Sequence, residues 1–317
     1  MINSTHCIIS TSKKYPNSWL VKGNNDIKLD IDFNNIEWRP SVTEEAMVVL
    51  VPKELHNRKE VVEAKEKELE LLKKFEIYEE TYAEDIKPNS EIVSSVWVIT
   101  EKDFDGGRVT KARLCARGYE ETRKIRKDSP TVSKNTLRIF CTIAANEGWT
   151  LEIRDAKSAF LQGDEIERTL YLQPPVEFKS SLHGDRVIWR LKKRLYGLAD
   201  APRGWYLRVE EELTGLGCEK SKLDPALFLY RVKGTIRGMV AVWVDDFLLA
   251  GNVEFYRKVP TVLKKVFVLG ESERRDFTYV GWQIQQNKNG SIIVHQNNFL
   301  RSIEEMDKLP QKKYTKQ

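Results

Sequence analysis

Residues 239–251 place two short apolar runs on either side of two adjacent carboxylates. Residues 239–244 are wholly apolar, Asp245 and Asp246 follow, and residues 247–251 are apolar again. This pattern predicts two buried strands joined by a tight acidic turn. Two adjacent like charges repel each other unless a cation lies between them. The pattern therefore favours a β-hairpin with a functional tip, although aspartate is also common in ordinary turns.

A second carboxylate, Asp155, extends the apolar face of a predicted strand over residues 151–155. Side chains alternate along a strand, so Leu151, Ile153 and Asp155 share one face. If this strand lies beside the 239–244 strand, Asp155 and Asp245 converge. With Asp246 they would offer carboxylate oxygens to a hard cation such as Mg²⁺. A turn or cap role remains open for each, because spacing alone does not make the strands neighbours.

The net charge of +5 is unevenly spread along the chain. Residues 108–138 hold ten Lys/Arg against three Asp/Glu, and residues 186–208 hold seven against one. Two concentrated basic segments favour a polyanionic partner such as nucleic acid. Ordinary solvated surfaces are the alternative.

Composition excludes several other classes. A helix needs about 18 consecutive apolar residues to span a bilayer, and the chain contains no such stretch. No membrane partner is therefore expected. No Cys-x-x-Cys pair occurs among the four cysteines, which argues against a zinc site or a disulfide framework.

The remaining pattern predicts an α+β fold with an antiparallel sheet. Apolar spacing and capping signals predict helices over 58–75, 133–146 (capped by Ser133 or Asn135), 200–216 (capped by Asp200), 254–267 and 298–307. Pro260 is expected to break or kink the fourth helix. Strands are expected over 92–100 and 108–114, joined at Asp105-Gly106-Gly107, and over 279–285 and 291–296, joined at Asn289-Gly290.

Five segments in order resemble the reverse transcriptase domain of copia-type long-terminal-repeat retrotransposons. They are KARLCARG at 111–118, DAKSAFLQG at 155–163, LKKRLYGLADAPRGW at 191–205, WVDD at 243–246 and YVGWQI at 279–284. Trp243 stands where that family usually has tyrosine. The resemblance implies a right-hand polymerase fold with fingers and palm over residues 44–317, with the thumb largely missing, after a leader over residues 1–43.

The resemblance also implies the roles of single residues. Asp155, Asp245 and Asp246 would be the catalytic carboxylates and would bind two Mg²⁺ ions, for which Mn²⁺ could substitute. Five residues would hold the deoxynucleoside triphosphate: Lys111, Arg113, Phe160, Tyr196 and Gly197. Four would contact the primer: Tyr279, Val280, Gly281 and Trp282.

The implied reaction is RNA-directed DNA synthesis, in which a primer 3′-hydroxyl attacks the α-phosphate of a deoxynucleoside triphosphate. Implied partners are an RNA or DNA template with its primer, deoxynucleoside triphosphates, and the RNase H and integrase regions of a parent Pol polyprotein. The resemblance suggests a cytoplasmic particle or the nucleus, whereas the residues themselves do not indicate a compartment. A catalytically inactive nucleic-acid-binding remnant of a retrotransposon is the alternative.

Overall fold

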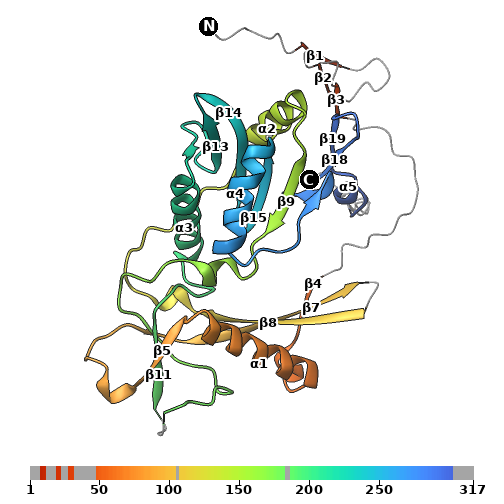
Figure 1. Cartoon of the computed structure of the whole chain (residues 1–317). Helices are drawn as coiled ribbons and strands as arrows, with labels where there is room; N and C mark the ends of the chain where they lie inside the picture. Colours follow the sequence, from red (N-terminus) through yellow and green to blue (C-terminus); the bar gives the residue numbers. More distant parts are fainter. Residues whose placement is uncertain are drawn as a thin grey trace, which may run out of the picture. The chain divides into compact units, whose positions relative to one another are not determined.

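The computed structural model describes residues 8–11, 19–22, 28–31, 48–104, 107–182 and 186–302. These residues belong to two compact units. Figure 1 shows the chain coloured by residue number. The larger unit comprises residues 41–140 and 152–272, and the smaller unit comprises residues 1–40, 141–151 and 273–317. Neither unit is a continuous segment, because the chain passes between them repeatedly.

The larger unit contains a sheet with the strand order β12-β13-β14-β15-β9. The strands are β12 (Cys218–Lys220), β13 (Leu227–Val232), β14 (Thr235–Trp243), β15 (Asp246–Gly251) and β9 (Leu151–Asp155). Two helices, α3 (Ala201–Gly215) and α4 (Val253–Val266), pack on one face of this sheet (Figure 1). The core between them contains Val240, Val242, Phe247 and Leu249 from the sheet. The predicted buried hairpin is therefore confirmed.

Helix α4 is continuous through Pro260, so of the predicted break or kink the break is wrong and the kink stays a prediction. Proline has no N–H, which leaves the Tyr256 carbonyl without its usual helical donor. The Thr261 hydroxyl donates to that carbonyl at 3.1 Å and replaces the missing bond. Pro260 itself is buried, so its ring also contributes apolar packing.

Two predicted helix caps have different outcomes. Ser133 caps α2 (Lys134–Asn146), because its hydroxyl accepts a hydrogen bond from the Thr136 N–H at 3.1 Å. Asp200 occupies the N-cap position of α3 without a capping hydrogen bond from its side chain. Its carboxylate instead accepts hydrogen bonds from Arg168 (2.8 Å) and Arg194 (2.9 Å). Burial alone would raise the pKa of Asp200, but the hydrogen bonds from these two arginines lower it below its ordinary value.

A second sheet in the larger unit has the order β4-β7-β8. Its strands are β4 (Val48–Leu50), β7 (Ser95–Phe104) and β8 (Gly107–Ala116), and the helix α1 (Lys59–Lys74) packs against β8. Ala112 on β8 and Ile99 on β7 form a small core with Val61 of α1. The predicted hairpin is confirmed, while Asp105 and Gly106 of its turn lie outside the described residues.

The third sheet of this unit explains why the predicted strand 92–100 is split at Ser94. Its order is β5-β11-β10-β6, and its strands are β5 (Tyr78–Tyr82), β11 (Val187–Leu191), β10 (Tyr171–Leu172) and β6 (Ile92–Val93). Val93 and Trp97 thus belong to two different sheets, which a run of β-branched residues does not reveal. Trp189 fixes the centre of this sheet by stacking on Tyr78 at 3.7 Å between ring centroids.

The smaller unit contains a sheet with the order β17-β18-β19. Its strands are β17 (Asp276–Tyr279), β18 (Trp282–Gln286) and β19 (Ile292–His295). The predicted single strand 279–285 is wrong, because Val280 and Gly281 form a turn between β17 and β18. The predicted hairpin at Asn289-Gly290 is confirmed as β18–β19.

Short elements complete the two units. The smaller unit also contains β1 (Ile8–Thr11), β2 (Trp19–Lys22), β3 (Lys28–Ile31), β16 (Glu273–Arg274) and α5 (Asn297–Ser302). The larger unit also contains the 3₁₀ helices η1 (Lys53–Leu55), η2 (Ala83–Asp85), η3 (Gly118–Glu120) and η4 (Ala159–Gln162). The fold is therefore a mixture of helices and mainly antiparallel sheets. Within the residues that the structure describes, no helix has the length and apolar character to cross a membrane.

Candidate functional site

Asp155 and Asp245 lie at the ends of neighbouring elements in the larger unit. Strand β9 ends at Asp155, β15 begins at Asp246, and the two strands are adjacent in the sheet (Figure 1). The Ala156 N–H donates to the Asp245 carbonyl at 2.8 Å. The structure therefore places the two predicted carboxylates together, an arrangement that the sequence pattern left open.

Asp245 lies in a two-residue turn that has unusual backbone geometry. Trp243 pairs with Asp246, so Val244 and Asp245 alone connect β14 to β15. Val244 has a φ of 53°, which is unfavourable for a β-branched residue. Trp205 of α3 donates its indole N–H to the Val244 carbonyl at 2.6 Å. Helix α3 therefore fixes the turn that presents Asp245.

Asp246 lies on the sheet face opposite to α3 and α4. Its cross-strand partner is Trp243, while the next residue, Phe247, belongs to the core beneath those helices. Ala156 also belongs to that core, so alternation along β9 places Asp155 on the same face as Asp246. The three predicted carboxylates thus lie at one end of the sheet.

A loop after α4 braces the end of β9. The Gly270 N–H donates to the Asp155 carbonyl at 2.7 Å, and the Lys157 N–H donates to the Val268 carbonyl at 3.0 Å. The Gln162 side chain accepts from the Val268 N–H at 2.8 Å and donates to the Lys157 carbonyl at 2.7 Å. Sequence reasoning missed this bracing role of Gln162 and Gly270, because it depends on a loop more than 100 residues distant from Gln162.

The charges around Asp155 give the site its electrostatic character. Burial raises the pKa of Asp155, and the negative charge of Asp245 raises it further. The positive charges of Lys111 and Lys157 act in the opposite direction. Asp155 is therefore close enough to feel both its partner carboxylate and a lysine from the distant β7–β8 hairpin.

The two neighbouring carboxylates fit a hard cation, because a cation would relieve their mutual repulsion. Among the described residues, no three His, Cys, Asp or Glu side chains form a ready-made metal cage. Magnesium commonly takes only one or two protein carboxylates and completes its shell with water and substrate phosphate. The sharing of two ions among the three aspartates stays a prediction.

Lys111 and Arg113 lie on the outer face of β8, as the predicted hairpin requires. Both side chains are exposed, whereas Ala112 and Leu114 between and beyond them are buried. The Arg113 guanidinium lies over the Tyr196 ring at 5.7 Å from its centroid. This distance is within the range of a cation–π contact.

Phe160, Tyr196 and Gly197 gather next to this face. The Phe160 and Tyr196 rings lie 5.7 Å apart at 56°. The Tyr196 carbonyl accepts from the Ala116 N–H at 2.7 Å, which attaches its loop to β8. Gly197 has a φ of 87°, and a Cβ there would lie 2.0 Å from the Ala116 carbonyl oxygen. Glycine is therefore required at position 197, and the five residues predicted to hold the triphosphate form one neighbourhood.

Two further polar groups next to this neighbourhood were missed. Burial raises the pKa of Tyr196, while hydrogen bonding from Ser158 and the charge of Arg113 lower it. In the sequence, Ser158 was distinguished only as a member of the segment 155–163 that resembles the family. Glu68 is buried on α1, and its negative charge also raises the pKa of Tyr196. Its spacing from Ala64 and Leu72 on the buried helix stripe is the signal that could have found it.

The predicted primer-contacting residues occupy the β17–β18 turn of the smaller unit. Tyr279 and Trp282 are buried and pair across the turn. Val280 and Gly281 both have positive φ, 53° and 72°, and Gly281 is exposed. Their backbone conformation matches a two-residue type I′ hairpin.

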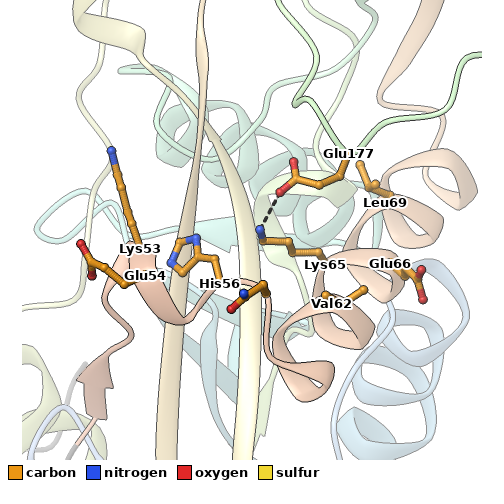
Figure 2. Close-up of a pocket in the computed structure, with 9 residues that line it drawn as sticks. Lys53, Glu54, His56, Val62, Lys65, Glu66, Leu69 and Glu177 are labelled. Atoms are coloured by element: carbon orange, nitrogen blue, oxygen red, sulfur yellow. Dashed lines mark hydrogen bonds and ion pairs between the residues drawn. The ribbon is translucent and has the colours of Figure 1, made fainter.

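A surface cavity of about 520 Å³ lies beside α1 and contains none of the predicted site residues (Figure 2). The Lys65 ammonium donates to the Glu177 carboxylate at 2.6 Å along its wall. The same carboxylate accepts from the Trp97 indole N–H at 3.1 Å. These contacts join α1 and β7 to the loop after β10. The polar groups along the cavity wall therefore bind one another and hold these elements together.

Residues 80–315 match the family model described as reverse transcriptase (RNA-dependent DNA polymerase). This match covers most of the chain, so the chain belongs to that family. The copia-type resemblance is confirmed by curated relatives from plants and yeast. The chain is 34% identical over 170 residues to the retrovirus-related Pol polyprotein from transposon RE2 of Arabidopsis thaliana, covering 52% of this chain and 12% of the relative. It is 32% identical over 161 residues to the Pol polyprotein from transposon TNT 1-94 of Nicotiana tabacum, covering 49% and 12%.

A longer alignment joins the chain to a yeast element. It is 26% identical over 270 residues to the transposon Ty1-LR2 Gag-Pol polyprotein of Saccharomyces cerevisiae, covering 78% of this chain and 14% of the relative. The chain therefore spans roughly an eighth of the length of these polyproteins.

Solved structures show a weaker likeness. A foamy viral protease-reverse transcriptase in complex with double-stranded DNA has a TM-score of 0.45 and 11% identity, covering 85% of this chain and 42% of that one. Telomerase from Candida tropicalis has a TM-score of 0.39 and 10% identity, covering 71% and 58%.

Proposed function

We propose that this chain is the catalytic part of an RNA-directed DNA polymerase that extends a primer 3′-hydroxyl with deoxynucleotides. The observation that carries the proposal is the meeting of Asp155 and Asp245 at the ends of adjacent elements, within the electrostatic reach of Lys111. A carboxylate pair beside a cationic strand is the combination that nucleotidyl transfer requires, because negative charge must be both supplied to metals and neutralised on phosphate.

The proposal assigns the chain's parts to the right-hand architecture. The sheet β12-β13-β14-β15-β9 with α3 and α4 would be the palm, because it carries the three aspartates. The sheet β4-β7-β8 with α1 would belong to the fingers, because it carries Lys111 and Arg113. Residues 44–317 would form this domain, with residues 1–43 as a leader.

Each proposed residue has a role that its chemistry supports. Two bound Mg²⁺ ions, or Mn²⁺ in their place, would activate the primer hydroxyl and stabilise the leaving oxygen. Asp155 and Asp245 would hold these ions, with Asp246 completing the acidic group. Lys111 would act on the triphosphate as a point charge, and Arg113 as a planar fork of donors.

Three residues would shape the nucleotide site. Phe160 packs on Tyr196 and would limit the space beside the sugar, which favours deoxyribose over ribose. Gly197 would let the backbone approach β8 closely. The turn Tyr279, Val280, Gly281 and Trp282 would contact the primer, supported by the exposure of Gly281 at its tip. Template, primer and deoxynucleoside triphosphates are thus the proposed partners, with the RNase H and integrase regions of the parent polyprotein.

Primer extension on poly(rA)/oligo(dT) with Mg²⁺ tests the activity. We expect incorporation by the parent chain and a fall of about a thousandfold in Asp245→Asn, since several kcal/mol of transition-state stabilisation would be lost. Asp85→Asn, an exposed aspartate of η2, serves as the matched control and should retain activity. Equal rates for Asp245→Asn and the parent would remove Asp245 from the site.

The same assay separates the alternative function. A well-folded parent chain that incorporates nothing, yet binds nucleic acid in a salt-sensitive manner, would be a binding remnant rather than a polymerase.

A further inference from the structure

Glu68 is a buried carboxylic acid directly behind the cationic strand β8. The residue is 7% exposed, and its Oε1 atom accepts a hydrogen bond from the Leu114 N–H at 3.4 Å. Strand β8 is an edge strand with β7 as its partner in the sheet. The edge of β8 away from β7 is therefore held at Leu114 by Glu68 and at Ala116 by the Tyr196 carbonyl.

The charged and titratable groups around Glu68 form one electrostatic unit. Arg113 immediately precedes Leu114, and its guanidinium lies over the Tyr196 ring. The charge of Arg113 lowers the pKa of Glu68, while Glu68 raises the pKa of both Cys115 and Tyr196. Lys65, one turn earlier on α1, is bound to Glu177 instead (Figure 2). Arg113 is thus the cation that acts on Glu68.

Glu68 changes its charge near neutral pH. Burial raises its pKa to about 7, and the Leu114 hydrogen bond and the Arg113 charge only partly oppose that shift. A carboxyl group with this pKa is mostly ionised at pH 8 and mostly neutral at pH 6. The negative charge that Glu68 places near Arg113 therefore changes within the pH range of an ordinary activity profile.

We propose that Glu68 is a positioning residue for the triphosphate-binding side chains: its carboxylate, hydrogen-bonded to β8 one residue from Arg113, competes with phosphate for the positive charge of Arg113, and protonation removes that competition. This rests on the proposed function, because Arg113 is taken there as a phosphate ligand. A triphosphate brings negative charge to Arg113, so its binding and the protonation of Glu68 favour each other. Affinity for the triphosphate falls as the pH rises above about 7, by at most about tenfold per pH unit.

Glu68→Gln tests this, because glutamine keeps the acceptor for the Leu114 N–H but cannot ionise. Glu70→Gln on the exposed side of the same helix is the matched control. The probe is dTTP, titrated onto the chain bound to poly(rA) and a dideoxy-terminated primer between pH 6 and 8.5. Glu68→Gln should bind dTTP about 3- to 10-fold more tightly than the parent at pH 8 and equally at pH 6. Parallel pH profiles for the two proteins would overturn the proposal.

A second measurement keeps the test decisive if Glu68→Gln unfolds. Calorimetry of the parent and Glu70→Gln in two buffers of different ionisation enthalpy gives the protons taken up on binding. Uptake by the parent at pH 8, beyond that of dTTP itself, is expected. No such uptake would contradict the proposal, because Glu68 would then keep its charge.

The proposed role of Glu68 and the proposed polymerase activity are contradicted by different results. In steady-state extension, the effect of Glu68→Gln should appear in KM for dTTP and leave kcat within about twofold. Incorporation with a KM that has the same pH dependence in both proteins would contradict only the role of Glu68. Binding that depends on Glu68 and pH, without any incorporation, would contradict only the activity. No dTTP binding by the parent at any pH would overturn both.

Discussion

The β14–β15 hairpin and the β7–β8 hairpin carry the two halves of the proposed site in opposite physical settings. β14–β15 lies between β13 and β9, and nearly all of its side chains from Gly238 to Gly251, outside the turn, are buried. β7–β8 has one protected face, and β8 forms an edge whose outer face is charged. The carboxylates therefore depend on the sheet itself, whereas the cations depend on what braces β8 from outside.

This difference teaches that the two hairpins respond to different changes. The acidic turn is fixed by its neighbours in the sheet and by Trp205, so substitutions of single surface residues should leave it in place. The position of Lys111 and Arg113 depends on α1 and on the Tyr196 loop. Disturbing either brace should move the cations while the aspartates stay in position.

The largest expected effect comes from Gly197→Ala, which attacks the brace of β8. The new Cβ would lie 2.0 Å from the Ala116 carbonyl oxygen, and the positive φ adds strain. We expect a loss of roughly 2–4 kcal/mol of unfolding free energy, measured by urea denaturation. Gly148→Ala is the control with a similarly positive φ but open space around its Cβ. Equal losses in the two variants would show that the contact with Ala116 contributes nothing.

Removing one cation should have the next largest effect and leave the fold intact. Lys111→Ala is expected to raise KM for the nucleotide by about 10- to 100-fold, because a charge-assisted contact to phosphate contributes about 1.5–3 kcal/mol. Lys67→Ala, which removes an exposed lysine of α1, should change KM by less than twofold. An increase of similar size in both variants would mean that KM depends on the net charge of the protein and not on the position of Lys111.

The smallest effect should come from Val244→Asn in the acidic turn, and it should be stabilising. Asparagine tolerates positive φ better than a β-branched residue does, so we expect a gain of up to about 1 kcal/mol in unfolding free energy. Val280→Asn in the β17–β18 turn, with the same φ of 53°, should gain a similar amount. A gain at Val280 but a loss at Val244 would indicate that the valine side chain has a packing role beside Asp245.

Local patterns predicted most of the β14–β15 hairpin and little of what braces β8. Alternation and apolar runs were sufficient for the strands around Asp245, and the resemblance supplied the partner strand of Asp155. The break at Ser94 and the turn at Val280 were not predictable, because both depend on which sheet receives each residue. Glu68 was hidden because a glutamate on a helix is usually solvated, and only tertiary packing buries it.

At Pro260 the local pattern predicted a helix break that the structure does not have. Proline predicts interruption from local geometry alone, whereas the hydroxyl of Thr261 supplies the hydrogen bond that keeps α4 whole. That compensation involves a single neighbouring atom, which no periodicity argument contains. Residue-level roles at the site accordingly needed the structure as well as the resemblance.

The two-residue turn at Val244 and Asp245 has a genetic consequence. Successive side chains of a strand point to opposite faces of the sheet. One extra residue between Trp243 and Asp246 would therefore turn every following side chain of β15 to the opposite face, unless a β-bulge accommodated it. Phe247 and Leu249 would leave the core, and the carboxylate of Asp246 would enter it. Insertion of a single codon there should abolish function as completely as a frameshift, while substitution of Val244 alone is tolerated.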